Sequence, residues 1–320
     1  MAANRPSIAI VGSTNLDLVV SVARAPGPGE TVIATAFERG FGGKGANQAV
    51  MAARFEVEVA FIGAVGDDPF GEPMARNLRD AGLSIEGLAV VPGPSGTAQI
   101  WVEPDGTNRI VVIAGANGAV DRTAVAASIA GLPRLDVVVG QLEIPQAATS
   151  AAFEAAKARG AVTILNPAPA AELEPRLLAA TDWLVPNEIE IAQLAGAAIE
   201  ASDTSIAAFG RDAGRGLVVT LGAAGASLVL DGHMTLVPSP TVAAVDSTGA
   251  GDAFVGAFAV GLALGLESAV AVRLGVACAA DSVTRAGAQA SYPDRARVAD
   301  LLGQAISQPS GPGTNASSSG

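Results

Sequence analysis

From residue 135 onward, short apolar runs alternate with helical patterns, and this alternation constrains the fold more than any other feature of the chain. The runs LDVVVG, AVTILNP, WLVPNE and RGLVVTLG are apolar on both faces, and helical patterns separate them. Strands of this kind belong to a mostly parallel sheet with helices on each side. Two earlier runs, 8–12 and 57–66, add further buried strands. We therefore predict an α/β fold.

Two stretches interrupt the alternation, because residues 18–37 and 97–114 read as strands and turns with no helix between them. The second stretch carries a strong hairpin signal, with TAQIWVEP and TNRIVVIA on either side of Asp105-Gly106. We expect strands from about 14–40 and 96–114 to form a small discontinuous sheet that covers one end of the core as a lid. The alternative is a meander that extends the main sheet.

The last third of the chain is predicted to end in helices over 250–265, 267–284 and 295–306. We expect one α/β domain, with its lid, over residues 1–306. The remaining segment, 307–320, is rich in Ser, Gly and Pro, so we predict that it is disordered.

Charge and residue usage exclude several classes of function. Asp and Glu number 31 against 19 Lys and Arg, a net charge of −12, which opposes adhesion to nucleic acid or anionic membranes. One cysteine, Cys278, and one histidine, His233, leave no material for an intrachain disulfide or a Cys/His zinc cluster. Because His233 lies in a turn-like segment, general-base work falls more naturally to a carboxylate.

No apolar run is suited to a secretory signal or to a membrane span. The run over 8–12 is too short for a signal core, and the stretch over 253–266 contains three glycines and falls short of the ~20 residues that a bilayer requires. We therefore expect a cytoplasmic protein that acts on neither nucleic acid nor membranes.

The first chemical motif is GFGGKGANQA, residues 40–49, between a strand-like run over 31–37 and a helical pattern. It satisfies G-x-G-x-x-G, but the acid that a dinucleotide site needs about 20 residues later is not clearly placed, and Gly45 after Lys44 excludes a Walker A loop. A glycine turn that a ligand can approach closely remains, with Lys44 as donor and Asn47 as donor and acceptor. The alternative is a glycine-rich helix start with a solvated lysine.

The second motif, residues 244–258, is a strand-like run, a glycine turn and a long apolar helix. Ser247 or Thr248 can cap the helix, and residues 249–251 leave their amides free for an anion. Asp252 would repel a bound phosphate, which makes sense if its carboxylate takes a proton from a hydroxyl that attacks that phosphate. The alternative is a surface acid that complements the helix dipole.

The third motif, VPNEIEIAQL over 185–194, carries Asn187, Glu188 and Glu190 around a helix start. Carboxylates there could hold Mg²⁺, normally through water, because magnesium loses its water reluctantly. The alternative is a plain helix start.

The fourth motif, VVTLGAAGA over 218–226, is a buried strand that ends in Thr220, Gly222 and Gly225. Ligands of open α/β sheets bind at the carboxyl ends of strands, which is where these residues would lie. The alternative is a tight β-hairpin.

Taken in this order, the motifs resemble those of the ribokinase family of carbohydrate kinases, over about residues 7–302. FGGKGANQA at 41–49 and the segment around GAGD at 249–252 are the specific ones. Shorter landmarks accompany them, namely GSTNLD at 12–17, PGE at 28–30, GDD at 66–68, GAN at 115–117, QLE at 141–143, NPAPA at 166–170, PNE at 186–188, TLG at 220–222 and VTRAGAQ at 283–289. The resemblance implies a Rossmann-like three-layer core with a β lid, and transfer of the ATP γ-phosphoryl group to the 5-hydroxyl of D-ribose.

The resemblance also implies roles for residues of this chain. Asp252 would be the general base, beside an anion hole made by the amides of Gly249, Ala250 and Gly251. The sugar would bind Asn15, Asp17, Gly43, Asn47 and Glu143, with Lys44 near the transferred phosphate.

Further roles concern the nucleotide and the cations. ATP would lie along Asn187, Thr220, Gly222 and Gly225, and Glu190 would support Mg²⁺ through water. A monovalent cation, usually potassium, would bind Asp246, Thr248, Ser282, Arg285, Gly287 and Ser291, mostly through backbone oxygens.

The sequence departs from the family pattern at two places. Ser247 stands where the family often has threonine, and because the hydroxyl is kept we expect little effect. Phe55-Glu56 replaces a more usual glycine-containing turn, away from the predicted chemistry.

Free strand edges in a lid tend to be paired or covered, so we expect a homodimer joined through the lids. Alternative functions are a related kinase for deoxyribose, fructose or a nucleoside such as adenosine, an NAD-dependent dehydrogenase that uses the glycine motif, and a non-catalytic sugar-binding homologue. The last would have no need of Asp252.

Overall fold

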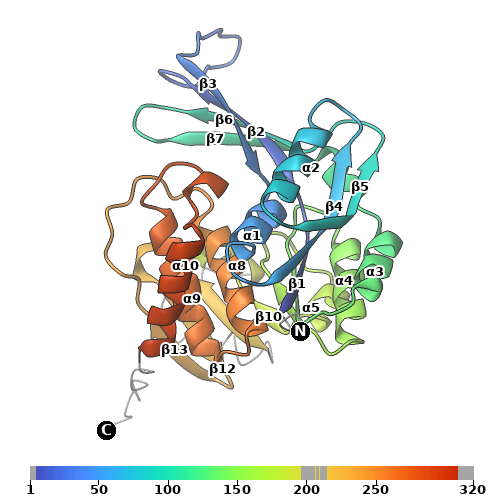
Figure 1. The fold of residues 1–320 in the computed structure, drawn as a ribbon. Helices are drawn as coiled ribbons and strands as arrows, with labels where there is room; N and C mark the ends of the chain where they lie inside the picture. Colours follow the sequence, from blue (N-terminus) through green and yellow to red (C-terminus); the bar gives the residue numbers. More distant parts are fainter. Residues whose placement is uncertain (1–4, 196–205, 207–208, 210–214, 309–320) are drawn as a thin grey trace.

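The computed structural model describes residues 5–195, 206, 209 and 215–308, which form a larger and a smaller sheet with helices around the larger one (Figure 1). The last helix runs to Ser307, one residue beyond the predicted end. Residues 309–320 of the segment that we predicted to be disordered lie outside the described part of the chain.

The larger sheet has nine strands in the order β13-β12-β11-β10-β9-β8-β1-β4-β5. Pairing is parallel from β5 to β11 and antiparallel for β12 and β13, which confirms the mostly parallel sheet. The strands are β1 (Ser7–Val11), β4 (Glu58–Gly66), β5 (Ser84–Val91), β8 (Val137–Gly140), β9 (Val162–Leu165), β10 (Trp183–Leu184), β11 (Gly216–Thr220), β12 (Ala226–Leu230) and β13 (His233–Val237).

Helices cover both faces of this sheet. The helices are α1 (Lys44–Ala52), α2 (Gly71–Asp80), α3 (Arg122–Gly131), α4 (Gln146–Lys157), α5 (Pro175–Ala179), α6 (Glu188–Leu194), α8 (Ala250–Ala263), α9 (Ser268–Ser282) and α10 (Arg295–Ser307), with short 3-10 turns η1 (Gly115–Ala119), η2 (Gly222–Ala224) and η3 (Gln289–Ser291). No described helix is long and apolar enough to cross a membrane.

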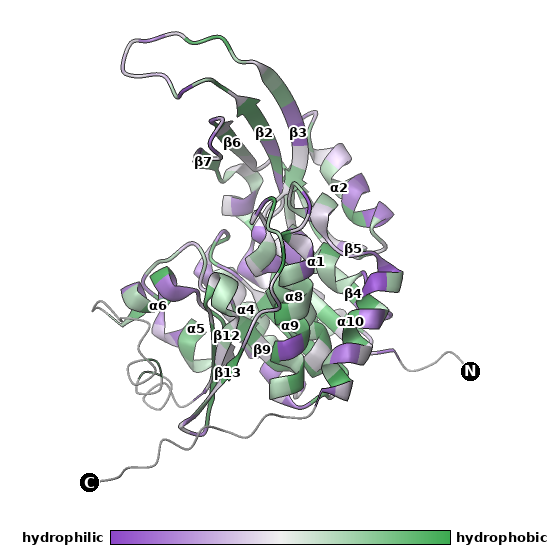
Figure 2. Cartoon of the chain, turned by 90° about the vertical axis from the view of Figure 1, so that its left-hand side faces the viewer, coloured by the Kyte–Doolittle hydropathy of each residue, from purple (hydrophilic) through white to green (hydrophobic). Residues whose placement is uncertain are grey.

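Alternating side chains of the strands divide the core into two layers. Ile8 and Ile10 of β1 belong to one layer together with residues of α1, α8, α9 and α10, whereas Ala9 and Val11 belong to the other layer together with residues of α3 and α4. Because successive side chains of a strand point to opposite faces, the buried run of β1 serves both layers. Figure 2 shows α8 as mostly hydrophobic, in keeping with its burial between the sheet and α9.

The smaller sheet has the order β3-β2-β6-β7 and is separate from the larger one, so the predicted lid strands do not extend the main sheet. They are β2 (Asn15–Ser21), β3 (Ala36–Gly42), β6 (Thr97–Val102) and β7 (Asn108–Ile113), and they project from one end of the body (Figure 1).

One part of the lid prediction is wrong. The strand-like run over 31–37 belongs to a strand only at its last two residues, because pairing with β2 begins at Ser21 opposite Ala36. Ile33 is 91% exposed and pairs with no strand. The glycine motif predicted as a turn from Gly40 instead continues β3 to Gly42, and the chain turns at Gly43, where φ is +89°.

Candidate functional site

The four sequence motifs meet at one cavity of about 210 Å³, beside the start of α8 and the carboxyl ends of β9, β10 and β11. The residues that line it are Lys44, Asn166, Ala168, Val185, Asn187, Glu190, Thr220, Gly249, Gly251, Asp252 and Val255. Residues far apart in the sequence therefore converge on one small polar space, as the rule for open α/β sheets predicts.

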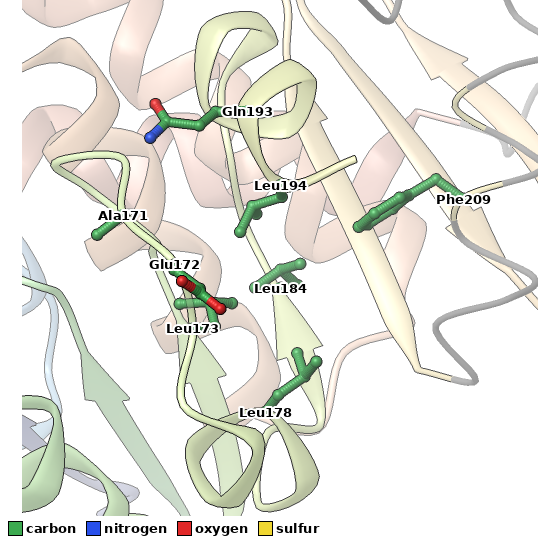
Figure 3. Close-up of a pocket in the computed structure, with 8 residues that line it drawn as sticks. All are labelled: Ala171, Glu172, Leu173, Leu178, Leu184, Gln193, Leu194 and Phe209. Carbon is green, nitrogen blue, oxygen red and sulfur yellow. The ribbon is translucent and has the colours of Figure 1, made fainter. Parts of the chain in front are cut away.

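A second cavity, of about 570 Å³, is larger but has a different lining (Figure 3). Its lining is mainly apolar, with four leucines among eight residues, and Glu172 and Gln193 are the polar side chains. None of the predicted site residues lies there, so the smaller polar cavity is the candidate active site.

Asp252 lies in the first turn of α8 and is only 8% exposed, which excludes a surface acid. Its Oδ2 accepts from Asn47 Nδ2 and its Oδ1 accepts from Gln48 Nε2, both over 2.9 Å. The helices α1 and α8 can lie close together because Gly256 of α8 has no side chain. A Cβ on Gly256 would lie 2.6 Å from the backbone carbonyl oxygen of Gln48 on α1. Burial raises the pKa of Asp252, whereas Lys44 and the two amides oppose that rise.

The start of α8 differs from the prediction. Gly249, with φ at +75°, caps the helix without a side-chain hydrogen bond, and the preceding residues are not a strand. The Thr248 hydroxyl donates to Asp246 Oδ1 over 2.7 Å, because that carboxylate folds back over the turn. Neither Ser247 nor Thr248 therefore acts as the cap that we predicted.

Two of the three predicted anion-hole residues line the cavity, namely Gly249 and Gly251. The N–H of Ala250 donates to the Ser247 carbonyl over 3.2 Å, so it is already engaged. The N–H of Gly251 has no acceptor among the described residues, and it lies at the positive end of the helix dipole.

Lys44 lines the same cavity, which excludes a lysine that merely extends into solvent. Its backbone N–H donates to Glu143 Oε2 over 3.0 Å, and this bond fixes the start of α1. Burial alone would lower the pKa of Lys44, but the charges of Asp252, Glu143 and Glu190 raise it. The lysine is therefore held as a cation beside Asp252.

The predicted sugar residues come from three parts of the chain: Asn15 and Asp17 lie on the lid strand β2, Gly43 and Asn47 lie at and in the start of α1, and Glu143 lies between β8 and α4. Burial, followed by the charges of Glu143 and Asp252, raises the pKa of Asp17 to about 7. Glu143 also accepts from the Ser13 hydroxyl. Asn15 is 3% exposed, and its Oδ1 accepts from Asn117 Nδ2 over 2.8 Å.

The predicted nucleotide residues are partly at the cavity. Asn187 and Glu190 form a reciprocal capping box at the start of α6, and Asn187 pairs with Thr220 in a parallel bridge. Burial raises the pKa of Glu190, opposed by the Asn187 N–H and by Lys44. Gly222 and Gly225 are not among the cavity residues and belong to the β11–β12 connection. That connection is the tight hairpin that we gave as the alternative.

The predicted cation residues lie on two adjoining segments, one before α8 and one that runs from the last residue of α9 to the turn η3. The Val245 N–H donates to the Val283 carbonyl over 2.7 Å, and the Gly287 N–H donates to Asp246 Oδ2 over 2.8 Å. Arg285 Nε donates to the Ser291 carbonyl over 2.9 Å, and the Arg285 N–H donates to the Ser282 carbonyl over 3.2 Å. Within the described ranges, no three His, Cys, Asp or Glu residues form a group that could hold a metal ion.

Sequence reasoning missed an amide network around Asp252. On one side, Gln48 accepts from Gln141 Nε2 over 2.6 Å and donates to Asn166 Oδ1 over 3.1 Å. On the other, Gln289 Nε2 donates to Asn47 Oδ1 over 3.0 Å. Gln141, Asn166 and Gln289 lie inside the family landmarks QLE, NPAPA and VTRAGAQ, and that position is the signal that could have identified them.

Comparison with known proteins agrees with this geometry. A model of the family described as pfkB family carbohydrate kinase matches residues 5–295. The chain is 36% identical to the ribokinase of Haemophilus influenzae, over 93% of this chain and 99% of that protein, and 38% identical to the deoxyribokinase of Salmonella typhi, over 89% and 95%. The solved structure of Arabidopsis thaliana ribokinase complexed with ribose and ATP matches with a TM-score of 0.83 and 32% identity, over 93% of this chain and 99% of that one.

Proposed function

The chain belongs to the pfkB family of carbohydrate kinases, and from this membership we propose that it transfers the γ-phosphoryl group of ATP to the 5-hydroxyl of D-ribose. The observation that carries the proposal is the buried carboxylate of Asp252, which shares a cavity with Lys44 and the start of α8. A dehydrogenase that uses the glycine motif does not fit this family. We propose one kinase domain over residues 1–306, with the small sheet as a lid on its sugar side.

In this proposal Asp252 accepts the proton of the sugar hydroxyl as that oxygen forms its bond to the γ-phosphorus. The bond between the γ-phosphorus and the β,γ-bridging oxygen breaks, and ADP leaves. The negative charge on the transferred phosphoryl group is stabilised by the Gly251 N–H, which has no acceptor among the described residues, by the helix dipole and by Lys44. The remaining catalytic contribution is the in-line positioning of the two substrates.

We propose that Asn15, Asp17, Gly43, Asn47 and Glu143 hold the sugar. The Asn47 carbonyl already accepts from Gln289 and one of its N–H groups already donates to Asp252, so Asn47 offers the sugar its second N–H. Asp17 and Glu143 offer acceptors for neighbouring hydroxyls. Because a sugar that lacks one hydroxyl would leave a buried acceptor unpaired, we expect ribose to be preferred over 2-deoxyribose by up to ~10⁴-fold in kcat/KM.

The nucleotide is proposed to lie along Asn187, Thr220, Gly222 and Gly225. Glu190 fits a role toward Mg²⁺, because its carboxylate lines the cavity and only its Oε2 accepts a hydrogen bond from the described residues. When bound, Mg²⁺ would neutralise part of the phosphate charge.

The two loops around Asp246 and Ser291 fit a monovalent cation such as potassium. Hydroxyl, carbonyl and carboxylate oxygens of Asp246, Thr248, Ser282, Arg285, Gly287 and Ser291 come from two adjoining segments, and such oxygens suit a hard cation. The Asp246 oxygens and the Ser282 and Ser291 carbonyls each accept a hydrogen bond and keep further lone pairs, and we propose that backbone carbonyls supply most of the ligands.

We propose that the protein is a homodimer joined through the lids. Ile110, Val111 and Val112 of β7, an edge strand of the lid, are all more than half exposed, and an apolar free edge of this kind is usually covered. A cytoplasmic location stays a prediction from the sequence.

The test is ADP release from Mg-ATP with D-ribose, 2-deoxyribose, fructose and adenosine, each with and without potassium. A ribose-selective signal that potassium stimulates would support the proposal. The main competing substrate is 2-deoxyribose, because deoxyribokinases are as similar to this chain as ribokinases are. Activity with 2-deoxyribose alone would keep the mechanism and overturn the sugar assignment, and no activity with any sugar or nucleoside would favour a binding protein.

A further inference from the structure

Gln48 is the most deeply placed partner of Asp252. Its side chain is 0% exposed, and its amide is fully engaged. One Nε2 proton goes to Asp252 Oδ1 over 2.9 Å and the other to Asn166 Oδ1 over 3.1 Å, while Oε1 accepts from Gln141 Nε2 over 2.6 Å. Since Gln48 does not line the cavity, it has no direct contact with a substrate there.

The direction of these amides follows from the carboxylate. An ionised carboxylate only accepts hydrogen bonds, so Gln48 must turn its NH₂ group toward Asp252. Its carbonyl then faces Gln141, which must in turn present its own NH₂ group. Gln141 Oε1 is left buried and without a partner among the described residues, against Gly12, where a Cβ would overlap it.

An unpaired buried acceptor is unfavourable, so this arrangement needs a compensating interaction. Reversing both amides would turn Gln48 Oε1 toward Asp252, where two acceptors would repel unless Asp252 took up a proton. The unpaired Gln141 oxygen is therefore a consequence of the orientation in which the Gln48 NH₂ group donates to Asp252.

We propose that Gln48, oriented by Gln141, is a positioning residue that keeps the Asp252 carboxylate a hydrogen-bond acceptor aimed at the cavity. The proposal rests on the proposed role of Asp252 as base. Asn47 supplies the matching donor on Oδ2, so each carboxylate oxygen is held by one amide of α1 and keeps a lone pair for the sugar hydroxyl.

Other charged or titratable groups also act on Asp252 and must be held constant in any test. They are Asp17 of β2, Lys44 of α1, Glu143 in the loop after β8, Glu190 of α6 and Tyr292 in the segment before α10. Lys44 favours the ionised carboxylate, and the acidic groups oppose it. Substituting Gln48 or Gln141 changes none of these groups.

The first experiment compares the pH dependence of kcat for the wild type, Gln48→Met and Gln141→Met. Methionine keeps much of the volume of glutamine but provides no N–H donor. Losing a hydrogen bond to a charged group should move the acid limb of the kcat profile to higher pH by about one unit in Gln48→Met. Gln141→Met should move it in the same direction by less, although Gln141 does not touch Asp252.

Thr149→Val is the matched control. Thr149 is also 0% exposed. Its hydroxyl donates to the backbone carbonyl of Gln141 over 3.4 Å and does not bond to the Gln141 side chain. This variant should lower stability without moving the acid limb. If all three variants lower kcat equally at every pH, with no movement of the limb, the proposal is wrong.

A second measurement does not need enzyme activity. The loss of thermal stability in Gln48→Met should be larger at pH 9 than at pH 5, because the lost bond is stronger to the ionised carboxylate of Asp252 than to its protonated form. In an Asp252→Asn background this pH dependence should disappear. A loss that is the same at both pH values would overturn the positioning role, whereas absence of phosphoryl transfer in the wild type would overturn only the proposed function.

Discussion

Gly42 provides the space that the Asp17 carboxylate occupies, since a Cβ on Gly42 would overlap both carboxylate oxygens. Gly40, two residues earlier on β3, is directly opposite Asp17, yet its Cβ would lie 3.9 Å from the Asp17 Cβ. The two glycines share a strand and a face, but only one of them shapes the predicted sugar site.

Gly42→Ala should therefore displace the Asp17 carboxylate and raise KM for ribose by about tenfold or more, the equivalent of one lost hydrogen bond to a charged group. Gly40→Ala is the matched control and should leave KM near its wild-type value. Steady-state kinetics with ribose as the varied substrate would check both. Equal effects of the two substitutions would remove Asp17 from the sugar site.

Asp17→Asn should stabilise the protein at neutral and higher pH. The pKa of Asp17 is raised from 3.8 to about 7 in the folded state, so between these values the folded chain holds a proton that the unfolded chain has lost. Stability contributed by this group is therefore lost as pH rises from about 4 to 7. The variant lacks that loss, and its advantage should grow over this range and then level off.

Thermal unfolding from pH 4 to pH 9 would measure the effect. We expect a Tm gain of roughly 2 °C or more at pH 8, the shift that about 1 kcal/mol produces in a large domain. Glu38→Gln, at an exposed position of β3, is the control and should show no such trend. A gain that is constant with pH would contradict the raised pKa.

Asp252→Asn should lower kcat by about 10² to 10⁴, the usual contribution of a positioned general base, while ATP still binds. The substitution keeps the shape of the side chain but removes the proton acceptor. ADP release gives kcat, and calorimetry with ATP gives the affinity. Near-normal turnover would exclude Asp252 as the base, and loss of ATP binding would point to a collapsed site instead.

Val111→Asp should convert the proposed dimer into a monomer, because it places a charge in the exposed apolar row of β7. Val90→Asp makes the same change at a residue that is 69% exposed on the edge strand β5 of the larger sheet, and it should leave the assembly intact. Light scattering at working concentration measures both. A monomeric wild type would overturn the lid interface.

The sequence was sufficient for the sheet, the covering helices and the separate lid strands, because each depends on a local pattern of apolar residues. It was not sufficient for turns whose geometry is set by tertiary contacts. The run over 31–35 has the apolar residues of a strand but forms no strand pair, and Thr248 turns its hydroxyl to Asp246 instead of capping α8.

The site was predictable in part for the same reason. Lys44, Asn187, Glu190, Thr220 and Asp252 belong to motifs with recognisable spacing, and they meet at one cavity. The amides that orient Gln48 and Asn47 were out of reach, because Gln141 lies 93 residues from Gln48 and Gln289 lies 242 residues from Asn47. Such a pairing leaves no periodicity in the chain and follows only from the packing of distant elements.

The place of β1 in the sheet bears on how the chain is made. This nearly all-apolar strand lies between β4 and β8, and its Ser7 N–H bonds to Asp136, 129 residues later. During synthesis one edge of β1 therefore emerges well before its neighbour, and an unpaired apolar edge recruits other incomplete chains. The yield of native protein should depend on the time between the synthesis of β1 and the synthesis of β8. Slowing translation before residue 137 should therefore favour aggregation.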